Sequence, residues 1–169
     1  INIYVQKLKV EPVDPFLTTK NGYQEGPTDE TFVKGGKLQI KSHTLPHHSN
    51  LTQSEIDSIG GMEEIYKGQG LYIYRENRLI IAGGWMGLSR TYQLGKLARI
   101  EINIPSGLDD EWSTDVKKSS LQLPQKIKNR LKNLIQQPIK KSKRTYNFRG
   151  KKEEANEYWK IIETRDKNI

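Results

Sequence analysis

LYIYRENRLIIA, the stretch from Leu71 to Ala82, decides the fold class of this chain. Its two apolar segments, Leu71–Tyr74 and Leu79–Ala82, flank the polar sequence Arg75-Glu76-Asn77-Arg78. Within that sequence, asparagine tolerates the left-handed backbone that a tight turn needs. The pattern predicts an antiparallel β-hairpin with its turn over residues 75–78.

Three further segments predict strands that could join this hairpin. Ala98–Ile104 alternates strictly between apolar and polar residues, which is typical of a half-buried strand, and Pro105 ends it. Leu38–Ser42 predicts another strand, and Ile1–Val5 predicts a first one. Lys20–Thr31 contains two glycines and a proline with few apolar residues, so we expect a loop there.

Helices are predicted on either side of the hairpin. The sequence Thr52-Gln53-Ser54-Glu55 is a capping-box pattern, and Gly60-Gly61 should end the short helix that follows it. Another short helix is expected over Tyr92–Leu97, and Pro124 is well placed for the first turn of a third. A last helix is expected from Glu153 to Arg165.

The third helix has a clear apolar side. Ile127, Leu131, Leu134 and Ile135 recur at helical spacing and form one stripe, whereas the lysines and arginines between them lie mainly off it. Strands and helices in this order predict an α+β fold, with a mainly antiparallel or mixed sheet and helices packed on one face.

Composition narrows the function classes. The 169 residues include no cysteine, which excludes disulfides and thiolate chemistry and fits a cytoplasmic protein. No apolar run approaches the roughly 20 residues of a membrane span, so no membrane partner is expected. The chain begins with the strand-like Ile1–Val5 and not with Met, which predicts a piece of a longer protein without a signal peptide.

Positive charge is concentrated in one part of the chain. Lys117–Lys152 carries thirteen Lys or Arg residues and no Asp or Glu, while the whole chain has a net charge of only +8. Such a field attracts phosphate, either on a nucleotide or along a nucleic-acid backbone. The stretch divides into the Lys117-Lys118 pair, the third predicted helix, and a basic segment around Phe148-Arg149-Gly150 that we expect to be a loop.

The cations that follow Lys118 suggest an interface with DNA or RNA. The alternative is an amphipathic helix whose solvated face is rich in lysine. Any binding should be independent of sequence, because no base-reading signature accompanies the charges. The candidate residues are Lys126, Lys128, Arg130, Lys132, Lys140, Lys141, Lys143, Arg144 and Arg149.

Histidine and tryptophan offer weaker candidates. His43, His47 and His48 could hold a metal, but His47 and His48 would point to opposite faces if they lay on a strand, which favours a structural role. The three tryptophans could stack on bases, although their apolar neighbours favour core packing. No metal site is therefore predicted.

Four blocks in order resemble prokaryotic GHKL-type ATPases, relatives of DNA gyrase B, MutL, MORC and the ninety-kilodalton heat-shock chaperone. The blocks are Gln69–Ile80, Leu97–Pro105, Trp112–Ser119 and Thr145–Lys152. The resemblance covers most of residues 1–152 and is to the second, transducer domain of those proteins. It implies a sheet like that of ribosomal protein S5 domain 2, with a left-handed βαβ crossover. Residues 153–169 would lead to a further domain.

The resemblance also implies a role for the paired lysines. A transducer loop sends one lysine to the γ-phosphate of ATP in the preceding domain, and the matching segment here makes Lys118, or else Lys117, the candidate. A cation in that position favours ATP over ADP and stabilises charge during phosphoryl transfer. The motifs that bind adenine and magnesium in the family are missing from the sequence, so ATP and Mg²⁺ are expected in the parent protein only.

Three classes of function remain open on this sequence. The first is a transducer domain, with the ATP-binding domain of the same chain as partner and a homodimer in the parent. The second is a nucleic-acid-binding module that uses the basic helix and tail. The third and weakest is a chaperone-like domain that binds client proteins. The parent is expected to be an ATPase, and this piece alone is not.

Overall fold

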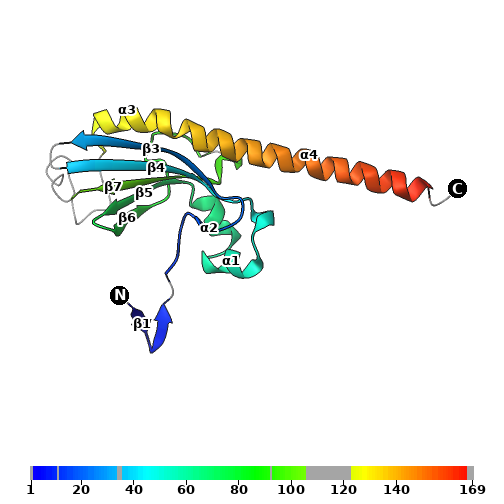
Figure 1. The fold of residues 1–169 in the computed structure, drawn as a ribbon, viewed down its shortest axis with the longest axis horizontal. Coiled ribbons are helices and arrows are strands. Elements are labelled where there is room, and N and C mark those ends of the chain that lie inside the picture. The colour runs from blue at the N-terminus through cyan, green and yellow to red at the C-terminus, as the bar shows by residue number, and fades with distance from the viewer. Residues whose placement is uncertain (1, 11, 34–35, 92, 106–122, 167–169) are drawn as a thin grey trace.

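The computed structural model describes residues 2–10, 12–33, 36–91, 93–105 and 123–166 (Figure 1). Its strands are β1 Ile3–Val5, β2 Leu8–Val10, β3 Gln24–Val33, β4 Gly36–Thr44, β5 Gly70–Arg75, β6 Arg78–Ala82 and β7 Ala98–Ile104. Its helices are α1 Gln53–Ser58, α2 Met62–Lys67, α3 Gln125–Leu134 and α4 Gln136–Asp166, with 3₁₀ turns η1 His48–Asn50 and η2 Gln93–Gly95.

Five of the strands form one mixed sheet in the order β3-β4-β7-β5-β6. Neighbouring strands are antiparallel except for β5 and β7, which run parallel. The predicted hairpin is present as β5–β6. Its turn is tighter than expected, because the strands extend to Arg75 and Arg78 and leave two residues between them. These two residues, Glu76 and Asn77, both have positive φ. The fold class is therefore α+β, as the sequence predicts.

The main core lies between the sheet and the helices α3 and α4. Alternate residues of the central strands point to this side, among them Ile40 on β4 and Ile100 on β7. They meet the predicted helical stripe, in which Ile127, Leu131 and Ile135 are buried. Figure 1 shows α3 and the first half of α4 covering this face of the sheet.

The other side of the sheet, which we call the open face, carries the remaining polar and aromatic side chains. Its residues are Lys37, Gln39, Lys41 and His43 on β4, Tyr72 and Tyr74 on β5, and Arg99, Glu101 and Asn103 on β7. A loop that includes Phe16 covers one end of this face by stacking on His43. The α1–α2 pair packs at that same end in a second, smaller core.

The capping box predicts the start of α1 correctly. The Thr52 hydroxyl accepts a hydrogen bond from the Glu55 amide, and the Glu55 carboxylate accepts one from the Thr52 amide. Gly60 and Gly61 then take positive φ and separate α1 from α2. Of the helix expected over residues 92–97, only η2 forms among the described residues.

The prediction of a loop over Lys20–Thr31 is wrong from Gln24 onward, where β3 begins. β3 is an edge strand, so its proline leaves no ladder hydrogen bond unmade inside the sheet. A register shift between Glu25 and Thr28 accommodates Gly26 and Pro27 opposite Ser42, whose hydroxyl donates to the Pro27 carbonyl.

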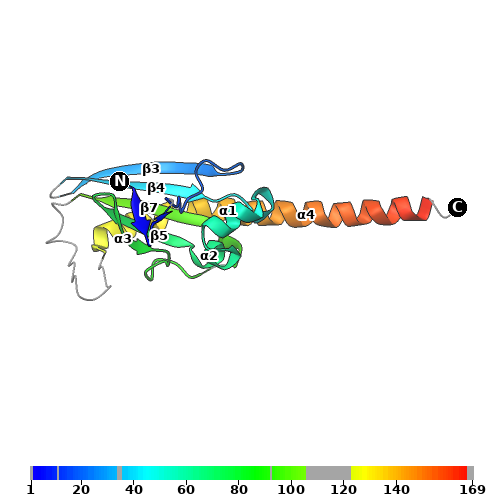
Figure 2. The same cartoon turned by 90° about the horizontal axis from the view of Figure 1, so that it is seen from below.

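The prediction of a loop around Phe148-Arg149-Gly150 is also wrong, because α4 runs through it without a break. Glycine inside a helix costs only about 1 kcal/mol relative to alanine, which one long helix tolerates. Tyr146 packs against the smaller core and supports this stretch from the body side. In Figures 1 and 2 the helix continues well past the sheet.

The β1–β2 hairpin stands away from the rest of the molecule on the side of the open face (Figures 1 and 2). Its side chains are exposed on both faces. None of the helices in the described part of the chain is both long and apolar enough to cross a membrane.

Candidate functional site

The segment predicted to face a nucleotide phosphate, with Lys117 and Lys118, lies outside the described residues. The nearest buried residues that the structure describes on either side of it belong to the main core. Before it, Ile104 at the end of β7 is buried, and after it Leu123 is buried immediately ahead of α3. Both residues belong to the same hydrophobic cluster, so this segment connects the central strand directly to the helical layer.

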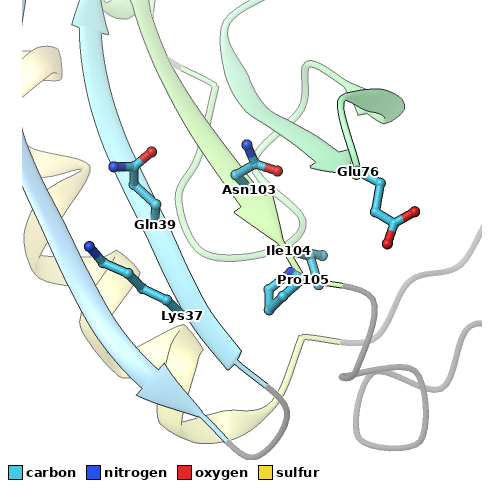
Figure 3. Close-up of a pocket in the computed structure, with 6 residues that line it drawn as sticks. All are labelled: Lys37, Gln39, Glu76, Asn103, Ile104 and Pro105. Atoms are coloured by element: carbon cyan, nitrogen blue, oxygen red, sulfur yellow. The ribbon is translucent and has the colours of Figure 1, made fainter.

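A pocket of about 370 Å³ opens beside the point where this segment begins (Figure 3). Lys37 and Gln39 line it from β4, Asn103, Ile104 and Pro105 from the end of β7, and Glu76 from the β5–β6 turn. The Lys37 ammonium pairs with Glu30 at 2.6 Å, and the Gln39 amide donates to the same carboxylate at 3.0 Å. The positive charge of Lys37 is therefore partly neutralised by Glu30. The side-chain amides of Gln39 and Asn103 give the pocket polar groups that can form hydrogen bonds.

Tyr23, His43 and Glu101 form a hydrogen-bonded row on the open face. The Tyr23 hydroxyl lies 2.7 Å from His43 Nδ1, and His43 Nε2 lies 3.1 Å from the Glu101 carboxylate. His43 is buried, and the Phe16 ring stacks on it with centroids 4.2 Å apart. Because both ring nitrogens are already engaged, the row attaches the covering loop to the sheet and leaves no imidazole nitrogen for chemistry.

The charges of this row follow from its contacts. The hydrogen bond from His43 holds the pKa of Glu101 below its ordinary value, against the opposing effect of burial. Burial raises the pKa of Tyr23 to about 12, with smaller contributions from Glu25, Asp14 and Glu101. At neutral pH Tyr23 therefore stays a neutral hydroxyl, and Glu101 is a carboxylate.

Arg99 is the buried cation of the open face. Its guanidinium donates to the backbone carbonyls of Pro15, Glu64 and Ile65 and lies over the Tyr72 ring, 5.1 Å from the centroid. Burial lowers its pKa from the ordinary value. Arg99 joins the covering loop, the end of α2 and the sheet, so its role is structural.

The three histidines considered as metal ligands have structural partners. His47 and His48 do not lie on a strand, so the argument from opposite faces does not apply to them. They form the start of η1, their ring centroids are 4.0 Å apart, and Tyr146 packs edge-on against His47. Within the described ranges, no group of three His, Asp or Glu side chains gathers to hold a metal ion.

Of the three tryptophans, the described side chain is that of Trp85. It is buried in the main core, as expected, and its indole N–H donates to the Gln69 side chain. Trp112 and the side chain of Trp159 lie outside what the structure describes.

The structure divides the predicted nucleic-acid candidates into two groups. Arg130 pairs with Asp29 on β3, Lys141 donates to the Glu25 carbonyl, and Arg149 donates to Asn50. These three bind α3 and α4 to the body, and Lys128 and Lys143 are half-buried beside them. Arg130 is exposed despite its ion pair, and the other exposed members of the set, Lys126, Lys132, Lys140 and Arg144, make no such contact with the described part of the chain.

Sequence reasoning did not identify the pocket or the Tyr23-His43-Glu101 row. One signal was available, since the polar positions of the two alternating strands β4 and β7 must share a face. Their pairing across about sixty residues could not be deduced from local pattern alone, and the pocket depends on it.

No protein-family model, curated protein or solved structure matches this chain.

Proposed function

We propose that this chain is the transducer domain of a GHKL-type ATPase. In this proposal it couples the nucleotide state of a preceding ATP-binding domain to the position of the α3–α4 helices. The observation that supports the proposal is that Ile104 and Leu123, which precede and follow the stretch containing Lys117 and Lys118, are buried in the same hydrophobic core. The sequence resemblance to transducer domains supports the same assignment.

The coupling follows from this connectivity. A lysine attracted to the γ-phosphate pulls on a segment whose two anchors lie in the central strand and at the start of α3. Close-packed interiors transmit such a displacement because their side chains have few voids into which to relax. ATP would draw the segment toward the preceding domain, and ADP, lacking the terminal phosphate, would release it.

The remaining parts of the assignment belong to the parent protein. Its ATP-binding domain would supply the adenine pocket and the Mg²⁺ site, and closure around ATP would bring two parents together as a homodimer. The same ancestry favours a cytoplasmic location. The chain described here would neither bind ATP tightly nor hydrolyse it alone.

The test uses the parent protein. Lys118→Ala should reduce ATP turnover by about two orders of magnitude, the effect typical of losing one group that stabilises transition-state charge. The separate variant Lys117→Ala shows which of the two lysines supports ATP turnover. Lys67→Ala is the matched control, since Lys67 is an exposed lysine on α2 paired only with Glu63.

Unchanged turnover in Lys117→Ala, Lys118→Ala and the double variant would contradict the proposal. A loss of equal size in Lys67→Ala would contradict it as well, because the effect would then follow from net charge. ATP turnover by the 169-residue chain itself would contradict the assignment of ATP binding and hydrolysis to the preceding domain.

A further inference from the structure

As far as Lys152, the helices α3 and α4 form a rod whose positive charge is not neutralised by any acidic residue of its own. Residues 124–152 include eleven Lys or Arg and no Asp or Glu. The two helices follow one another along nearly one line over the sheet (Figures 1 and 2). At 1.5 Å per residue, the acid-free part is about 42 Å long.

The cations of this rod point in two directions. Arg130 reaches down to β3, where it makes a two-pronged ion pair with Asp29, Nε to Oδ2 at 2.9 Å and Nη2 to Oδ1 at 2.8 Å. Lys141 and Arg149 also contact the body, through the Glu25 carbonyl and Asn50. These cations hold the rod in place and are only partly available to a ligand.

The outward set is different. Lys126, Lys132, Lys140 and Arg144 are exposed and form no hydrogen bond or ion pair with any residue that the structure describes. Lys140 and Arg144 are one helical turn apart, and Lys151, seven residues further, continues their stripe along α4. Unpaired cations distributed along an extended rod suit a partner that carries negative charge along its length.

The aromatic content of the rod indicates which polyanion fits. Binding of single strands relies on successive aromatic side chains that stack on unpaired bases. On this rod, within residues 124–152, the exposed aromatic side chain is Phe148, with 69% of its surface accessible, while Tyr146 packs inward. A duplex, whose phosphates are accessible and whose bases are already stacked, needs only the cations.

We propose that the outward face of α3–α4 binds the phosphate backbone of double-stranded nucleic acid. Lys126, Lys132, Lys140 and Arg144 are the contacting residues. Binding is independent of base sequence, since the contacts are to groups that every duplex shares. The proposal stands on the charge and exposure of the rod and does not require the transducer assignment.

The experiment measures fluorescence anisotropy of the 169-residue chain with a labelled DNA duplex of about 20 base pairs, from about 20 to about 200 mM NaCl. Separate arms use an RNA duplex and the single strand of the same sequence. Four phosphate contacts predict that log K falls with log salt with a slope of about −3.6. The duplexes should bind more tightly than the single strand.

The variant Lys140→Gln/Arg144→Gln should weaken duplex binding about tenfold or more at low salt and reduce the slope by about two. Its matched control is Lys7→Gln/Lys67→Gln, which removes the same charge from the β1–β2 turn and from α2. Circular dichroism verifies that each variant keeps its helices. The control should stay within about twofold of the unmodified chain.

Three outcomes overturn the proposal. The first is no duplex binding by the unmodified chain at the lowest salt. The second is an equal loss in the two double variants, which would mean that net charge alone attracts the duplex. The third is tighter binding of the single strand than of either duplex. If the RNA duplex and the DNA duplex bind alike, the shared phosphate backbone is confirmed as the ligand.

Discussion

The imidazole of His43 lies 3.1 Å from the carboxylate of Glu101, across the β4–β7 pair. On its other side the same ring is 2.7 Å from the Tyr23 hydroxyl, in the loop that covers one end of the open face. One buried ring therefore joins two central strands to a segment twenty residues earlier in the chain. Glu101 gives this contact a dependence on pH.

Replacing Glu101 with Gln should destabilise the fold by about 1 kcal/mol at neutral pH, the contribution of a hydrogen bond to a partly exposed charge. The folded-state pKa of Glu101 is depressed below its ordinary value of 4.5, chiefly by His43. Its contribution is therefore complete above pH about 4.5 and is lost as pH falls through the lower folded pKa.

Urea unfolding of both forms between pH about 6 and about 3 tests this sign, because the difference in stability should shrink toward the acid end. Glu64→Gln, a change at an exposed carboxylate on α2, should show little difference at any pH. A gap between Glu101→Gln and the unmodified chain that grows on acidification would contradict the assignment.

The capping box of α1 predicts a local loss of stability. Thr52→Ala removes the hydroxyl that accepts from the Glu55 amide and should cost about 1 kcal/mol. The returning bond from the Thr52 amide, helped by Lys20, lowers the pKa of Glu55 to about 2. Thermal unfolding measures the loss, and Ser54→Ala, at the second residue of the helix, should leave the midpoint unchanged or raise it.

Gly70, at the start of β5, cannot accept a side chain because it lies against the backbone of Gly84. A Cβ on Gly70 would lie 2.3 Å from the Gly84 carbonyl oxygen, and Gly70 has a φ of +129°. The close approach is maintained by the bond from the Leu71 amide to that oxygen. Gly70→Ala must separate these backbones, so we expect a loss of several kcal/mol or failure to fold.

Gly87→Ala is the matched control for this change. Gly87 also has positive φ, at +75°, but open space surrounds its Cβ position. Only the backbone strain remains, about 1 kcal/mol. Equal effects of the two substitutions on the urea midpoint would mean that the contact with Gly84 contributes nothing.

Gly150 tests the continuity of α4. A Cβ there meets no neighbour, and the residue lies in the interior of the helix. Gly150→Ala should therefore raise helix content by circular dichroism and stabilise the protein by about 0.5–1 kcal/mol. If residues 145–152 formed a loop in solution, the substitution would leave the helix signal unchanged, and Gly150→Pro would be equally silent.

Local rules predicted those elements whose signals are complete within a few residues. The capping box at Thr52, the Asn77 turn and the alternation of Ala98–Ile104 are of this kind. β3 was missed because a glycine and a proline inside a strand are acceptable only at a sheet edge, and which strand is at the edge depends on the complete topology.

The continuity of α4 was missed for a related reason. The stretch around Gly150 has weak intrinsic helix preference, and its helical state is supported by contacts of Tyr146 and Arg149 with distant residues. The basic character of the candidate interface was evident from the sequence. Which cations face outward was not, because Arg130 meets Asp29 only after a strand about one hundred residues earlier is in place.

Because α4 is one unbroken helix, a small tilt where it packs on the body produces a larger displacement at its far end. Among the side chains that the structure describes, Arg149 makes the last contact of the helix with the body, while the backbone continues as helix to Asp166. An overhang of seventeen residues is about 25 Å long, so a tilt of about 10° at the body would move its tip by about 4 Å. A tilt too small to disturb the packed core would therefore move the far end of the helix by a distance comparable to the length of a side chain.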